Sequence, residues 1–101
     1  MSIFKDVLQE EYQRLQALKD KYHEELEKLP KGSISAKNRN NQYYYYLAYR
    51  VKDKVKFKYI GKKDSEALSK IEEQLSKRKE IESKLEQVNN AIKDLSKSVN
   101  E

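Results

Sequence analysis

The stretch QYYYYLAYRV, residues 42–51, decides the fold, because it is dense in residues that favour β-strands. A second run, VKFKYI at residues 55–60, alternates apolar and lysine side chains with the two-residue period of a strand. The three residues between the runs, Lys52-Asp53-Lys54, are the predicted turn, so the runs are expected to form an antiparallel hairpin. Residues 33–39 are expected to add a third strand through an Asn40-Asn41 turn, since an isolated hairpin is marginally stable in water.

Alternation along these strands sorts the side chains onto two faces. The first predicted face is apolar, suits packing against helices, and carries Tyr43, Tyr45, Leu47, Tyr49, Val51, Val55, Phe57 and Tyr59. The second predicted face is aromatic and cationic and carries Tyr44, Tyr46, Ala48, Arg50, Lys56 and Lys58.

Helical periodicity flanks the strands on both sides. Between residues 3 and 29 apolar side chains recur at steps of three, four and seven, and Pro30 followed by Gly32 ends this helix. A second helix begins at Asp64 or Ser65, either of which can cap it, and no Gly or Pro interrupts it. Its apolar stripe is expected to pack beneath the first helix or in a homodimer, and includes Leu85, Val88, Ile92 and Leu95.

These patterns together predict one α+β domain, residues 1–101. Two long amphipathic helices, antiparallel or coiled-coil-like, are expected to flank a central two- or three-stranded antiparallel β-meander. The corresponding segments are a helix at residues 1–30, a basic, Tyr-rich β segment at residues 31–63, and a helix at residues 64–101.

Charge divides the chain into the same three segments. Residues 1–30 and residues 64–101 each carry a net charge of −2. Residues 31–63 carry ten basic residues against one acidic residue, a net charge of +9. A charge block this localised creates a field that attracts polyanions.

The basic block and its tyrosines predict a nucleic-acid-binding surface. Lys and Arg neutralise phosphates, and aromatic rings stack on bases. A lysine-lined sheet edge that only prevents aggregation is the simpler explanation, but a net charge of +9 exceeds what edge protection requires. The predicted contact residues are Lys37, Arg39, Tyr44, Tyr46, Arg50, Lys54, Lys56, Lys58, Lys62 and Lys63.

Catalysis is not expected. A tyrosine nucleophile would need a supporting Arg-His-Arg constellation, whereas the one histidine, His23, lies among glutamates on the first predicted helix. The chain has no cysteine, and its two glycines form no phosphate-binding loop, so no metal or cofactor is expected. It has no run of about 18 apolar residues and no secretory signal at its start, so we expect no membrane span and a cytoplasmic location.

The stretches LPKGSI at residues 29–34, QYYYYL at residues 42–47 and KVKFKYIGK at residues 54–62 resemble a group of small uncharacterised prokaryotic proteins. In that group a "PxGS" start, a "YYYL" strand and a "KYIGK"-like strand lie between two helices, and the genes often lie near mobile elements. Many related members carry a cysteine cluster before the tyrosine strand. Residues 37–41 stand in that place here without cysteine, so the resemblance implies no metal site. It implies no activity either, because none is established for the group.

Two other functions stay open at this point. The first is a mobile-element- or phage-encoded inhibitor or adaptor that binds a host nucleoprotein, a CRISPR effector for example, through the basic sheet. The second is a structural coiled-coil dimerisation protein, which has no need of a net charge of +9 within 33 residues. The sequence separates neither the nucleic-acid-binding protein from the inhibitor nor DNA from RNA as the ligand.

Overall fold

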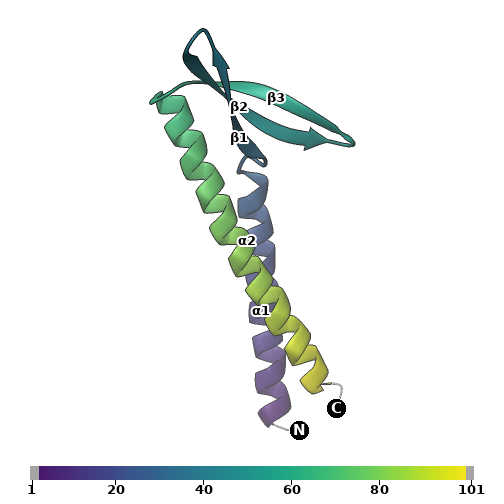
Figure 1. The fold of residues 1–101 in the computed structure, drawn as a ribbon. Helices are drawn as coiled ribbons and strands as arrows, with labels where there is room; N and C mark the ends of the chain where they lie inside the picture. Colours follow the sequence, from purple (N-terminus) through teal and green to yellow (C-terminus); the bar gives the residue numbers. More distant parts are fainter. Residues whose placement is uncertain (1–2, 100–101) are drawn as a thin grey trace. The chain divides into compact units, whose positions relative to one another are not determined.

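Residues 3–99 are described in the computed structural model, which contains two helices and one sheet (Figure 1). The elements follow in the order α1 (Ile3–Glu27), β1 (Ser33–Arg39), β2 (Gln42–Val51), β3 (Lys54–Lys62) and α2 (Glu66–Val99). The predicted α+β arrangement, with two helices flanking an antiparallel three-stranded sheet, is therefore confirmed. The chain divides into a sheet unit, residues 29–79, and a helical unit, which joins α1 to the part of α2 that begins at Glu80.

The sheet unit is a β-meander with strand order β1-β2-β3 and antiparallel pairing throughout. Asn40 and Asn41 connect β1 to β2 with φ angles of 53° and 64°. Two positive φ angles in a two-residue loop are typical of a type I′ turn, which matches the twist of the strands and which asparagine tolerates well. Lys52 and Asp53 connect β2 to β3, and Lys52 also has a positive φ, 57°.

Gly32 brings the chain into β1 along a path that only glycine follows without strain. Its φ is 139°, and a Cβ added there would lie 2.3 Å from the carbonyl oxygen of Ala48 and 3.3 Å from Leu47 Cδ1. The backbone at residue 32 therefore lies directly against the centre of β2. Leu47 is one of the two buried apolar side chains of the sheet unit, and the other is Leu68 on α2.

Ser65 begins α2 as its N-cap. The Leu68 N–H donates to Ser65 Oγ over 3.2 Å, and the Ser69 N–H donates to the Ser65 carbonyl over 3.1 Å. The side-chain bond satisfies an otherwise free amide of the first turn, which stabilises a helix by about 1 kcal/mol. Of the two predicted caps, Ser65 is thus the one that is used.

The helical unit has a thin apolar interior. Among its described residues, 3–28 and 80–99, the buried side chains are Leu15 on α1 and Ile81 and Val88 on α2. The other members of the predicted α2 stripe, Leu85, Ile92 and Leu95, are half-buried, so this stripe loses exposure within a single copy of the chain. A homodimer through α2 stays a prediction. Within residues 3–99, neither helix has a stretch apolar enough, over sufficient length, to cross a bilayer.

Arg78 interrupts the α2 stripe between its apolar members. It is half-buried, and its Nη1 donates to the backbone carbonyl of Leu29 over 3.2 Å. Both residues belong to the sheet unit. The apolar residues Leu75 and Ile81 are six positions apart, and this irregular step is explained by the Arg78 guanidinium between them, which binds a carbonyl just beyond the end of α1.

Candidate nucleic-acid interface

The turn between β2 and β3 decides which side chains share a face. It contains two residues, Lys52 and Asp53, and Val51 is paired with Lys54. The predicted turn had three residues, Lys52, Asp53 and Lys54, and a turn of that length would place Val51 opposite Val55. Because side chains alternate with a period of two, this difference of one residue turns most of β3 over.

The prediction that Lys56 and Lys58 lie among Tyr44 and Tyr46 was therefore wrong. Directly opposed residues on antiparallel strands share a face. Lys58 is opposite Leu47 and Lys56 is opposite Tyr49, which places both lysines on the face of the buried Leu47. We call the exposed row of Lys54, Lys56 and Lys58 the lysine face.

The opposite surface, which we call the aromatic face, consists of side chains from all three strands. Its rows of paired side chains follow β2 from Gln42 to Arg50. In this order they are Arg39 and Gln42; Lys37, Tyr44 and Lys62; Ser35, Tyr46 and Tyr59; Ser33, Ala48 and Phe57; and Arg50 and Val55. The aromatic rings occupy the middle rows, and basic side chains occupy both ends.

A β-bulge in β3 brings Lys62 onto the aromatic face. Tyr45 is opposite Gly61, but Tyr46 is opposite Tyr59, so Ile60 is the extra residue. After the bulge the alternation of β3 is reversed, and Lys62 lies opposite Tyr44. Without it, Lys62 would share a face with Lys58.

The tyrosine rings of the aromatic face contact one another through Tyr59, and the face remains accessible. Tyr46 and Tyr59 meet edge to face with centroids 5.4 Å apart, and Tyr44 and Tyr59 are 6.4 Å apart at a tilt of 47°. Phe57 and Tyr59 are nevertheless 50% and 51% exposed. Tyr44 also donates from its hydroxyl to Gln42 Oε1 over 3.0 Å. Mutual contact orients the rings before any ligand arrives.

Lys37 reaches diagonally across the aromatic face from β1 to β3. Its Nζ lies 4.3 Å from the Phe57 ring centroid and 5.1 Å from that of Tyr46. These are cation–π distances, and the ring quadrupoles attract the ammonium. One cation of this face is thus held above the rings in the free protein.

Residues 31–63, which we call the +9 segment, carry ten basic residues, and the fold distributes them between the two faces of the sheet and the connecting segments. Four lie on the aromatic face and three form the lysine face, while Lys31, Lys52 and Lys63 lie in connecting segments. Of the predicted contact residues, the aromatic face brings together Lys37, Arg39, Tyr44, Tyr46, Arg50 and Lys62. Phe57 and Tyr59 were predicted to lie on the packed, apolar face, whereas they lie on the aromatic face. A two-residue turn at Lys52-Asp53 is the signal that would have placed them correctly.

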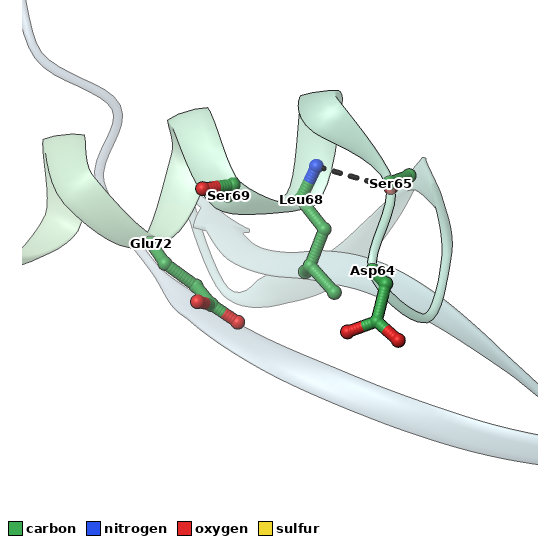
Figure 2. Close-up of a pocket in the computed structure, with 5 residues that line it drawn as sticks. All are labelled: Asp64, Ser65, Leu68, Ser69 and Glu72. Atoms are coloured by element: carbon green, nitrogen blue, oxygen red, sulfur yellow. Dashed lines mark hydrogen bonds between the residues drawn. The ribbon is translucent and has the colours of Figure 1, made fainter.

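A shallow hollow of about 270 Å³ lies along the start of α2 (Figure 2). It is lined by Asp64, Ser65, Leu68, Ser69 and Glu72. Figure 2 shows the capping bond that the Leu68 N–H donates to the Ser65 hydroxyl. The two carboxylates make the hollow unfavourable for a polyanion, so it is not part of the candidate interface.

One ion pair perturbs a titrating group, and it lies far along the sequence from the sheet. The Arg14 guanidinium donates to the Glu11 carboxylate over 2.6 and 3.0 Å, and these hydrogen bonds hold the pKa of Glu11 below its ordinary value. Both side chains are exposed on α1, and exposed pairs of this kind contribute little to stability. The pair therefore marks no functional site.

The chain belongs to a family described as a domain of unknown function, DUF6788, whose sequence profile matches residues 8–70. The matched region includes all three strands, and hence both faces of the sheet. No curated protein and no solved structure matches the chain.

Proposed function

We propose that this DUF6788 protein binds nucleic acid through the aromatic face of its sheet and does not catalyse a reaction. The observation that carries the proposal is the row of accessible rings between basic side chains at both ends of one face. Proteins that bind nucleic acid without a groove-reading helix use this combination, in which cations contact phosphates and rings stack on bases.

Charge elsewhere in the sheet supports the same function at longer range. The lysine face and the connecting segments carry six further basic residues, and the +9 segment contains only one acidic residue, Asp53. Such a field raises the rate at which a polyanion encounters the sheet, even where these lysines make no direct contact. The direct contacts with phosphates and bases are then made by the aromatic face.

An inhibitor or adaptor of a host nucleoprotein is the second candidate, and one observation favours it. Val55 and Phe57 are each about half exposed beside Tyr59 and Arg50, and protein interfaces are enriched in Phe, Tyr and Arg. A protein partner would bury this apolar patch directly. The two functions differ in salt dependence, because only phosphate contacts release condensed counterions.

Binding of an oligonucleotide is expected to weaken steeply with salt, by an amount set by the aromatic face. If its four basic side chains each contact one phosphate, the slope of log binding constant against log salt is about −3 to −4. Replacing Lys37, Arg39, Arg50 and Lys62 with glutamine should bring the slope close to zero. Fluorescence anisotropy titrations between about 50 and 200 mM salt measure it.

The lysine face provides the matched control. Replacing Lys54, Lys56 and Lys58 with glutamine removes nearly the same charge from the same sheet. The salt slope of this variant should differ from that of the wild type by less than about one unit. Circular dichroism establishes that both variants fold. A slope that disappears in the control but persists in the aromatic-face variant would contradict the proposed surface. If the wild-type protein binds no nucleic acid at about 50 mM salt, where phosphate contacts are strong, the inhibitor is the better explanation.

A further inference from the structure

Resting on the proposed nucleic-acid-binding function, we infer that the ligand is single-stranded, that its unpaired bases stack on Phe57 and Tyr59, and that Lys37 holds one of these base positions in the free protein.

The rings are presented in a way that suits unpaired bases. Phe57 and Tyr59 are half exposed on an open sheet, and Tyr59 is oriented by contacts with Tyr44 and Tyr46. In a duplex the flat faces of the bases are covered by their neighbours, and only base edges are accessible in the grooves. A ring standing on a sheet therefore gains stacking energy only from a base that is unpaired.

The basic side chains are spaced for a short strand of nucleic acid. From the row of Tyr44 to the row of Arg50 is six residues along β2, about 20 Å at roughly 3.3 Å per residue. Lys37 and Lys62 are at the first row, Arg50 is at the last, and the rings lie between them. A span of this length accommodates two or three stacked bases, as on other sheet platforms that bind single strands.

Lys37 occupies the space above the rings that a base would need. Its Nζ lies 4.3 Å from the Phe57 centroid, close to the distance at which flat groups stack. A base that stacks on Phe57 must displace this ammonium, which then becomes free to contact a phosphate. Lys37 consequently opposes binding through its cation–π contact and favours it through its charge.

Four ligands of about twelve nucleotides test the strand preference: single-stranded DNA, single-stranded RNA, the duplex, and an abasic single strand. At least one base-bearing single strand should bind about tenfold or more tightly than both the abasic strand and the duplex. Duplex or abasic binding equal to that of both single strands would overturn the inference while leaving the proposed function intact. Absence of binding to all four ligands would overturn both.

Lys37→Ala tests the displacement directly. The variant should lose about one unit of salt slope. Near 1 M salt, where phosphate contacts are screened, it should bind a single strand about two- to fivefold more tightly than the wild type, because the cation–π contact no longer competes. Arg39→Ala, on the same strand and face, should lose the slope without this gain. Equal or weaker binding of Lys37→Ala at high salt would overturn the role of Lys37.

Discussion

Replacing Phe57 and Tyr59 together with alanine is expected to lower the affinity for a single-stranded oligonucleotide by at least about 30-fold. Each base stacked on an aromatic ring contributes about 1–3 kcal/mol, so two lost platforms cost about 2–6 kcal/mol. The salt slope should hardly change, since stacking releases no counterions. Anisotropy titrations of the variant and the wild type at several salt concentrations separate the two quantities.

Tyr43→Ala is the matched control for this double variant. Tyr43 is 50% exposed, as Phe57 is, but lies on the opposite face of the sheet, where it pairs across from Asn38. Its loss should change the affinity by less than about twofold, because surface substitutions outside a contact have small effects. A double variant with wild-type affinity, or an equal loss of affinity in Tyr43→Ala, would show that bases do not stack on the rings of the aromatic face.

Gly32→Ala is expected to destabilise the sheet unit by about 2–6 kcal/mol, a large fraction of the stability of a small domain. Residues other than glycine are strained at a φ of 139°, at about 1–3 kcal/mol, and overpacking adds a similar amount. The new Cβ would lie 2.3 Å from the Ala48 carbonyl oxygen. That oxygen belongs to the backbone of β2, and residue 33 next to the glycine is paired with Ala48, so neither side can withdraw without breaking the sheet.

Urea unfolding followed by circular dichroism measures this loss, and Gly61→Ala provides the comparison. A Cβ at Gly61 would meet Ser65 Oγ at 2.6 Å, a side-chain atom that can rotate away. The expected cost is about 1 kcal/mol, since rotation sacrifices the N-cap of α2. If Gly32→Ala unfolds at the same urea concentration as the wild type, residue 32 does not lie against the Ala48 backbone with a positive φ.

Much of the fold was predictable from local sequence. The β-forming run at residues 42–51 coincides with β2, and Asn40-Asn41 forms the predicted turn because asparagine accepts the positive φ that such turns require. α1 ends at Glu27, shortly before Pro30, as proline dictates. These features depend on only a few neighbouring residues, and the signals were strong.

The faces of β3 were not predictable to the same extent. They depend on whether the turn after Val51 contains two residues or three. Lys52 adopts the positive φ of this turn, but a lysine gives no signal for it, unlike glycine or asparagine. The bulge at Ile60 then reverses the alternation once more, with Gly61 as its only local signal. The shorter turn thus moved Phe57 and Tyr59 onto the aromatic face and removed Lys56 and Lys58 from it, while the bulge placed Lys62 there.

The net charge of residues 31–63 follows from the sequence, but it does not tell which basic side chains lie on which face of the sheet. Lys56 and Arg50 are both basic and exposed, yet pairing across the sheet places them on opposite faces. The net charge of +9 therefore predicts an attraction for polyanions without identifying the surface that contacts them. That assignment requires the strand register.

Aromatic side-chain NMR during titration with a single-stranded oligonucleotide tests most directly whether the aromatic face is the nucleic-acid surface. Tyr45 and Tyr49 serve as internal controls, because they lie on the opposite face of the same strand as Tyr46. The ring resonances of Phe57, Tyr59 and Tyr46 should shift upfield through stacking, while those of Tyr45 and Tyr49 stay in place. Shifts confined to Tyr45 and Tyr49, or binding that leaves the Phe57 and Tyr59 rings unperturbed, would contradict this surface.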